Sequence, residues 1–260
     1  MSNVMDTVSL ARKTDRLNIQ DITSLMIDDF IELHGDRQYK DDEAIMGGIG
    51  RLNGRAVTVI GNKKGTTLEE NMASNFGSAH PEGYRKSLRL MKQAEKFNRP
   101  ILNFINTSGA YCGVEAEERG QGEAIARNLL EMSDLKVPVI AIILGEGGSG
   151  GALALALADE VWMMEYSIYS ILSPEGFASI LWKDSKKASD AAELMKLTST
   201  DLNDLGVIER VISETDGEDW LPKEVIIERL KSDINTKLQE LTLLPKEELV
   251  RNRYNRFRKF

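Results

Sequence analysis

The sequence predicts an α/β protein, and three observations support this fold class. Runs of β-prone apolar residues alternate with segments of helical periodicity along most of the chain. Residues 137–144 form a continuous apolar run, which is typical of a strand that helices cover on both faces. Asn53-Gly54 separates two short β-prone runs, and this dipeptide is the strongest short signal of a β-hairpin.

The first half of the chain is expected to form a helix, a hairpin, a second helix and a strand. Apolar residues at helical spacing predict the first helix, which ends before Gly35-Asp36. The expected bounds are 21–34 for the first helix, 44–52 and 55–61 for the hairpin strands, 81–97 for the second helix and 100–106 for the strand.

The second half continues the alternation of helices and strands. Ser173-Pro174-Glu175 is typical of a helix start, because serine is a good cap, proline suits the first position and a carboxylate suits the first turn. The expected helices are 116–135, 149–158, 174–181 and 185–197, and the expected strands are 137–144, 160–165, 168–172 and 207–212.

No repeat or linker divides the chain, so a single domain over residues 1–260 is expected. A helical segment at 1–34 and a helical tail at 222–260 are extensions of it. Residues 246–260 hold six basic and two acidic residues. Docking of this tail on an acidic partner and a solvated helix end are both open interpretations.

Composition excludes several classes of protein. The chain has 33 Lys and Arg against 41 Asp and Glu, a net charge of −8, which disfavours nucleic-acid binding. One cysteine and two histidines exclude a disulfide framework and a metal site rich in cysteine or histidine. No apolar run approaches the roughly 18 residues of a membrane span, and no signal peptide is recognisable. A soluble, cytoplasmic protein is therefore expected.

The most informative segment is the glycine-rich stretch from Gly145 to Gly151, between a buried strand and a helix of small residues. Five glycines in seven positions are costly in backbone entropy, so close approach or unusual φ must offset them. A helix that starts directly after them points free N–H groups towards the adjacent space. The stretch therefore indicates an anion or oxyanion site made of backbone.

Four interpretations of this stretch are open. Gly145, Gly147 and Gly150 satisfy the dinucleotide fingerprint, with Glu165 twenty residues further on. Ser149 fits a nucleophile elbow, although no histidine follows it in the chain and only a Ser-Lys dyad remains conceivable. An oxyanion hole without a nucleophile is the third interpretation. The fourth is a turn that only lets the helix pack close to the sheet.

A second glycine turn, residues 106–113, follows the strand at 100–106. Two successive strand–turn–helix units place two sets of amides at the carboxyl ends of neighbouring strands. Such an arrangement suits chemistry in which two oxygens gain negative charge, and it needs few acid–base side chains.

These turns and their flanking residues closely resemble the carboxyltransferase α subunits of bacterial acetyl-CoA carboxylase. The resemblance extends over residues 9–212. It rests on the motifs at 35–37, 47–49, 64–65, 75–77, 81–86, 106–121, 145–152 and 169–176.

The resemblance implies a ClpP/crotonase-like fold, a spiral of ββα repeats with a helical C-terminal extension. It also implies transfer of a carboxyl group from N-carboxybiotin, on a biotin carboxyl carrier protein, to acetyl-CoA, giving malonyl-CoA for fatty-acid synthesis. The implied partners are a β subunit, as α2β2, which holds acetyl-CoA and the zinc, and biotin carboxylase in the full complex. No permanently bound cofactor and no metal are expected in this chain. A crotonase-like hydrolase or hydratase acting without biotin and a non-catalytic scaffold are the alternatives.

Transferred residue by residue, the oxyanion hole falls on the backbone of Gly150 and Gly151, with Gly147 and Gly148 beside it. The implied substrate-binding residues are Gly109, Ala110, Tyr111, Gly113, Ser149, Glu175 and Gly176. For Glu175, a purely structural role at the helix start is the alternative to lining the biotin pocket.

The chain departs from the family pattern at Asn106, Ser108 and Cys112, where aspartate and two prolines are common. The backbone path of the turn is expected to survive this loss of φ constraints. Replacement of Gly151 by valine is expected to block the site and leave the fold largely intact. His80, before Pro81, is expected to be a loop residue.

Overall fold

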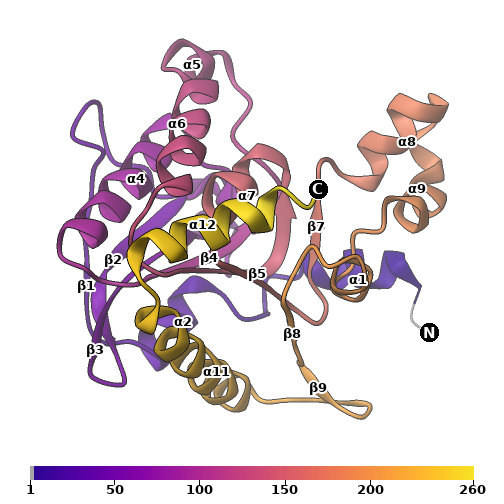
Figure 1. Ribbon diagram of the computed structural model, residues 1–260. Helices are drawn as coiled ribbons and strands as arrows, with labels where there is room; N and C mark the ends of the chain where they lie inside the picture. Colours follow the sequence, from indigo (N-terminus) through magenta and orange to yellow (C-terminus); the bar gives the residue numbers. More distant parts are fainter. Residues whose placement is uncertain (1–2) are drawn as a thin grey trace.

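A large mixed sheet forms the centre of the structure, a computed structural model that describes residues 3–260 (Figure 1). The strands follow the order β1-β2-β3-β4-β5-β6-β8, antiparallel from β1 to β3 and parallel from β3 onwards. β7 lies off this path and pairs with the end of β5. The bounds are β1 Asp28–Glu32, β2 Ile45–Leu52, β3 Arg55–Asn62, β4 Ile101–Thr107, β5 Val139–Gly148, β6 Glu160–Met164, β7 Ile168–Ser170 and β8 Arg210–Ile212, with a small separate pair β9 Thr215–Asp216 and β10 Asp219–Trp220.

Helices surround the sheet, and two of them, α8 and α9, pack on each other to one side of it (Figure 1). Within residues 3–260 no helix has the length and apolar character that a membrane span needs. The bounds are α1 Val4–Ala11, α2 Ile19–Leu25, α3 Leu68–Ala73, α4 Pro81–Lys96, α5 Val114–Glu118, α6 Gln121–Ser133, α7 Ser149–Ala156, α8 Pro174–Trp182, α9 Ala188–Met195, α10 Ser199–Asp204, α11 Lys223–Leu243 and α12 Lys246–Phe257.

Strand β5 is buried on both faces, as its apolar run predicts. Val139, Ala141 and Ile143 belong to the core beneath α4, α6 and α7. Ile140, Ile142 and Leu144 belong to the opposite core, which α2 and α11 cover. Since successive side chains of a strand point to opposite faces, one continuous apolar segment supplies both cores.

The predicted hairpin is confirmed as β2 and β3, paired from Ile45 with Asn62 to Leu52 with Arg55. Asn53 and Gly54 have φ values of 50° and 78°. A type I′ turn requires positive φ at both positions, which explains the Asn-Gly pair.

Two predicted helices are wrong in extent. The helix expected at 21–34 ends at Leu25, and β1 follows as an edge strand paired with β2, so the apolar spacing there serves a strand. The helix expected at 116–135 is two helices, α5 and α6, because Gly120 adopts a left-handed φ of 84° between them. At the first place, strand pairing overrides a continuous helical pattern. At the second place, a single residue with left-handed backbone interrupts it.

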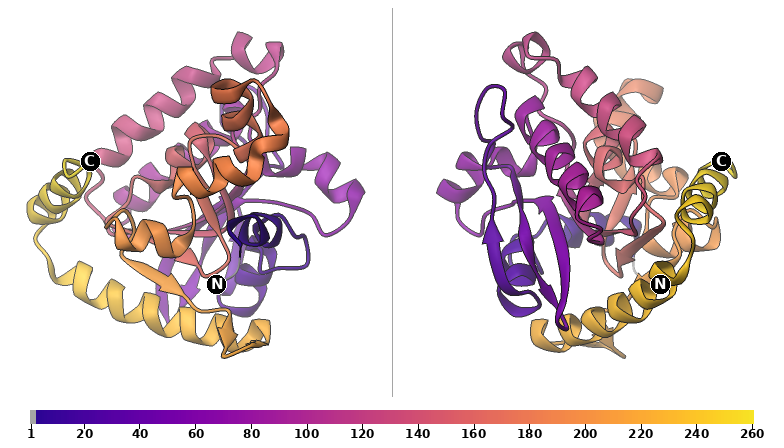
Figure 2. Two further views of the ribbon diagram at one scale, coloured as in Figure 1. Left: turned by 90° about the vertical axis from the view of Figure 1, so that its right-hand side faces the viewer. Right: turned by 60° about the vertical axis from the view of Figure 1, so that its left-hand side comes forward.

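The helical tail is confirmed as α11 and α12, which run along the outside of the molecule (Figure 2). Two of its basic residues, Arg253 and Arg256, are buried within this chain. Neither docking on a partner nor a solvated helix end therefore accounts for all of the basic residues of the tail. Arg253 binds Asp159 and donates to the carbonyl oxygens of Met132, Leu135 and Val137. Arg256 pairs with Glu209. The tail therefore clamps the ends of α6, β6 and β8.

Replacing Arg253 with methionine is expected to lower the free energy of unfolding by about 3–5 kcal/mol, because it leaves the buried Asp159 carboxylate and three carbonyls without their partner. Arg251→Met, at an exposed position of the same helix, is the matched control. Urea denaturation of both variants measures the difference, and equal losses would contradict the clamp.

Candidate functional site

The two glycine segments of the sequence lie side by side at the carboxyl ends of β4 and β5. The strands are parallel neighbours, and Thr107 at the end of β4 is paired with Gly147 near the end of β5. The turn after β4 and the start of α7 after β5 therefore share one edge of the sheet, as two successive strand–turn–helix units predict.

The contact between these segments is backbone on backbone. A Cβ atom on Gly151 would lie 2.5 Å from the amide nitrogen of Ala110 and 2.7 Å from the carbonyl carbon of Gly109. A Cβ on Gly148 would overlap the carbonyl group of Ser108. Gly148 and Gly151 are therefore required by close packing. Gly150 is different, because its Cβ would make only ordinary 3.7 Å contacts with Ile125.

The glycine-rich stretch is not a free turn over its whole length, which corrects the sequence analysis. Gly147 and Gly148 are the last residues of β5 and pair with Tyr169 and Ser170 of β7. The stretch is strand up to Gly148 because β7 offers a partner at this edge. Ser149, Gly150 and Gly151 are the first residues of α7, where N–H groups have no acceptor one turn earlier in the helix. Within this stretch, unpaired amides that could serve as oxyanion donors are thus confined to the helix start.

Ser149 occupies the junction between β5 and α7 with a φ of 49°, a conformation that non-glycine residues rarely adopt. Its position matches the strained strand–helix turn of a nucleophile elbow. Within residues 3–260, however, its hydroxyl makes no hydrogen bond to a lysine or histidine. The strain serves the abrupt change from strand to helix, and nothing in the site activates the hydroxyl.

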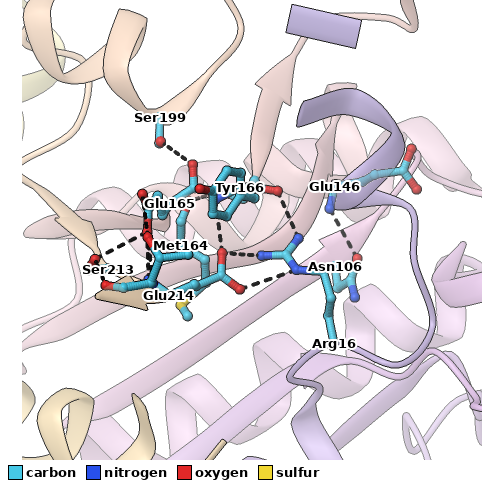
Figure 3. A network of polar contacts seen from close by, with 11 residues as sticks. Arg16, Asn106, Glu146, Met164, Glu165, Tyr166, Ser199, Ser213 and Glu214 are labelled. Atoms are coloured by element: carbon cyan, nitrogen blue, oxygen red, sulfur yellow. Dashed lines mark hydrogen bonds and ion pairs between the residues drawn. The ribbon is translucent and has the colours of Figure 1, made fainter. Parts of the chain in front are cut away.

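The acidic residue that the dinucleotide interpretation requires, Glu165, is engaged in other contacts. Glu165 accepts hydrogen bonds from the backbone amides of Glu214 and Thr215 and from the hydroxyl of Ser213 (Figure 3). The same figure shows Glu214 bound to Arg16, which ties the N-terminal segment to this edge. Glu165 therefore has an architectural role in place of a ribose contact.

The turn from Gly109 to Gly113 keeps a defined path without the two family prolines. Gly109 has a φ of 151°, which favours glycine. The Thr107 hydroxyl accepts from the Gly109 amide at 3.1 Å and donates to its carbonyl at 2.8 Å. The Gln121 amide donates to the carbonyl oxygens of Ala79 and Tyr111. Hydrogen bonds thus replace the missing φ constraints, and the expected backbone path is found.

Asn106 joins the two strand ends. Its side-chain oxygen accepts from the backbone N–H of Glu146 at 3.1 Å (Figure 3), and its backbone N–H donates to the side-chain oxygen of Asn62. Asparagine, at a position where aspartate is common in the family, thus still provides a side-chain oxygen that accepts a hydrogen bond.

A row of charged residues lies beside the glycine-containing end of β5, residues 145–148, which we call the glycine strand. The sequence did not predict these ion pairs. Arg12, at the end of α1, donates to both oxygens of Glu175 at 2.9 and 3.1 Å and to Glu146 at 3.1 Å. Lys64 binds the other oxygen of Glu146 at 2.7 Å. Arg12 also lines a small pocket with Ser108, Gly148 and Ser173. No sequence signal links Arg12 to residues 134 and 163 positions away.

The helix start at Ser173 is confirmed, with its hydroxyl accepting from the Gly176 amide at 3.1 Å and Pro174 at the first position. Glu175 is engaged by Arg12, whose hydrogen bond is the main reason that the pKa of Glu175 falls to about 2. The carboxylate therefore latches α8 to α1 and to the glycine strand.

Known structures share this arrangement of the chain. The transcarboxylase 12S hexamer gives a TM-score of 0.68 at 19% identity, over 85% of this chain and 42% of that chain. A Pseudomonas malonate decarboxylase hetero-tetramer in complex with coenzyme A gives 0.68 at 15% identity, over 85% of this chain and 89% of its own. By its fold the protein is thus of the crotonase-like α/β class, as the resemblance implies.

Sequence relatives define it more narrowly. The family model "Acetyl co-enzyme A carboxylase carboxyltransferase-like" matches residues 2–260, and the chain belongs to this family. "Acetyl-coenzyme A carboxylase carboxyl transferase subunit alpha" of Streptococcus thermophilus (strain ATCC BAA-491 / LMD-9) is 62% identical over 260 residues, 100% of both chains. The protein of the same name from Streptococcus pneumoniae (strain Hungary19A-6) is 60% identical over 258 residues, 99% of this chain and 100% of its own.

The contact geometry corrects the expectation for Gly151. Gly151→Ala is expected to destabilise the fold by about 1–3 kcal/mol, because the added carbon meets the Ala110 backbone, and valine is expected to do more harm. Gly150→Ala, one residue away, is expected to change stability by less than about 1 kcal/mol. Thermal unfolding of the two variants tests the difference, and similar midpoints would contradict the backbone contact.

The latch at Glu175 is expected to give a pH-dependent contribution to stability. Because its folded pKa, about 2, lies below the ordinary 4.5, the contribution is present above pH 4.5 and is lost as the pH falls towards 2. We expect Glu175→Gln to cost at most about 1 kcal/mol at neutral pH, since the pair is partly exposed, and nothing at the acid end. Denaturation series between these pH values measure it. In an Arg12→Met background the same substitution is expected to have no effect, and a full effect there would contradict the pairing.

Proposed function

We propose that this chain is the α subunit of a carboxyltransferase that moves the carboxyl group of N-carboxybiotin to acetyl-CoA, giving malonyl-CoA for fatty-acid synthesis. Biotin is carried by a biotin carboxyl carrier protein. The observation that carries the proposal is the apposition of Gly151 against Gly109 and Ala110. It brings the start of α7 and the turn after β4 to one place, within a chain of this family.

The backbone amides of Gly150 and Gly151 are the proposed oxyanion donors. Both belong to the first turn of an eight-residue helix, where free N–H groups and the helix dipole favour negative charge. As the N–CO2 bond breaks, the ureido oxygen becomes electron-rich, and donors fixed beforehand stabilise it without reorganisation. One such donor is typically worth a factor of about 10²–10³ in rate.

The side chains around the glycine strand are engaged in structural pairs. Glu146 and Glu175 bind Arg12 and Lys64. In the proposed reaction the biotin nitrogen released from the carboxyl group takes the proton of the acetyl methyl group, and the new carbon–carbon bond forms to the carboxyl carbon. This balance needs no protein base, so the chain contributes binding and electrostatic stabilisation.

The remaining parts of the reaction belong to partners in this proposal. A β subunit, as α2β2, holds acetyl-CoA and a zinc ion, and biotin carboxylase recharges the carrier. This chain has one cysteine, too few for a site of several thiolates. The relatives named as subunit alpha support a multisubunit assembly. We place the complex in the cytoplasm and propose no contact with nucleic acid or membrane.

The test uses the chain reconstituted with its β subunit, measuring decarboxylation of malonyl-CoA that depends on added biotin. Gly150→Ala is expected to fold normally and to lower kcat/KM about 10²-fold, because a methyl group beside the donor displaces the oxygen. Gly122→Ala, in α6 with nothing within 4 Å of the added carbon, is the matched control and is expected to be as active as the original.

Full activity of Gly150→Ala would contradict the assignment of the donors. Ester or peptide hydrolysis by the chain alone would favour the hydrolase, and binding of the β subunit without turnover would favour the scaffold.

A further inference from the structure

The place of His80 before Pro81 suggests a simple loop residue. In the structure, its side chain makes a specific contact. Its imidazole ring stacks on the ring of Tyr111, with centroids 4.1 Å apart and planes 25° from parallel. Tyr111 belongs to the turn after β4 and follows Ala110, whose amide nitrogen lies against Gly151. The stack therefore joins the start of α4 to the turn that faces the proposed oxyanion donors.

The orientation of the His80 ring is fixed by Asn75. The amide nitrogen Nδ2 of Asn75 lies 3.1 Å from Nδ1 of the ring. Since an amide nitrogen only donates, Nδ1 is the acceptor in this contact. The contact thereby fixes the plane of the ring.

Asn75 is held in place by a strained turn. Asn75 and Phe76 have φ values of 46° and 54°, which non-glycine residues rarely adopt. Gly77 anchors the turn, because its carbonyl accepts from Asn62 at 3.1 Å and a Cβ on it would lie 2.6 Å from the Asn106 carbonyl oxygen. Such strain persists only where surrounding contacts enforce it, and it gathers at functional sites.

The backbone near His80 is secured without the ring. The His80 amide donates to Asp42 at 2.8 Å, and the Tyr111 amide donates to the Ala79 carbonyl at 3.0 Å. These bonds define the path of the chain. The ring contact therefore adds something else, which is the direction of the Tyr111 side chain.

Tyr111 is partly exposed, and its neighbours define the position of its ring. His80 stacks on its ring, Gly113 leaves room for its Cε1 edge, and the neighbouring Glu115 carboxylate raises the pKa of the Tyr111 hydroxyl. A partly exposed tyrosine needs no such support for folding. Side chains that meet a substrate, in contrast, depend on neighbours that lock their rotamer.

We propose that His80 is a positioning residue of the carboxyltransferase site, whose ring, oriented by Asn75, fixes Tyr111 for contact with the biotin-borne substrate. Tyr111 follows Ala110 in the turn that packs against Gly151. The identity of that substrate rests on the proposed function. The stack and its effect on Tyr111 do not.

The kinetic test compares three variants and one control variant in the reconstituted enzyme, with free biotin as the varied substrate and malonyl-CoA in excess. An aromatic pair is worth about 0.5–1.5 kcal/mol, so His80→Ala is expected to raise the KM for biotin about three- to tenfold while kcat stays within about twofold. His80→Phe restores a flat ring and is expected to recover most of this loss. Asn75→Ala, which frees the ring, is expected to give a smaller rise. His34→Ala removes the other histidine, which pairs with Asp41, and is the control.

An unchanged KM in His80→Ala overturns the proposal. So does a loss of kcat with the same KM that tracks a lower melting temperature, because that is the mark of a purely structural residue.

A second measurement uses the full chain without its partner. The ring signals of Tyr111, assigned by comparison with Tyr111→Phe, are expected to shift in the NMR spectrum of His80→Ala, because the ring current of the imidazole is lost. Unshifted signals overturn the stack itself. If the unmodified chain reconstituted with its β subunit shows no biotin-dependent activity, the proposed function fails. The NMR measurement still decides whether His80 orients Tyr111.

Discussion

The structure depends on one close approach, between the backbone of residues 108–110 and the glycines at positions 148 and 151. Neighbouring parallel strands lie about 4.8 Å apart, so two turns that leave the same edge of a sheet compete for the same space. Glycine removes the side chains that would separate them. The start of α7 and the turn after β4 can then meet, and peptide N–H groups come to line the place where the strands end.

Charged residues near this edge serve mainly to bring distant segments together. Arg12 joins α1 to Glu146 and Glu175, and Arg16 joins the following segment to Glu214. At the far end of the chain Arg253 repeats the same device with Asp159. Burying a charge requires a partner and several hydrogen bonds, and the largely buried Arg16 and Arg253 have both, whereas Arg12 is partly exposed.

The support of the proposed site is layered. The amides of Gly150 and Gly151 are fixed by the helix, Tyr111 by its neighbours, and His80 by the strained turn at Asn75 and Phe76. Each layer is held by contacts further from the proposed donors. A site that works by pre-organised donors needs this rigidity, because donors that must reorganise during the reaction lose most of their advantage.

The sequence alone determined the fold class, the Asn53-Gly54 hairpin, the doubly covered strand β5 and the two glycine segments. These features depend on local chemistry: positive φ at a turn, an unbroken apolar run, and glycines that only a backbone contact explains. The tertiary structure decided the rest. It turned part of a helical pattern into β1 through pairing with β2, and it extended β5 through Gly148 because β7 pairs there. It also set Arg12 on Glu175 and His80 on Tyr111. Such pairs join residues far apart in the chain, and only the path of the folded backbone brings them within contact distance.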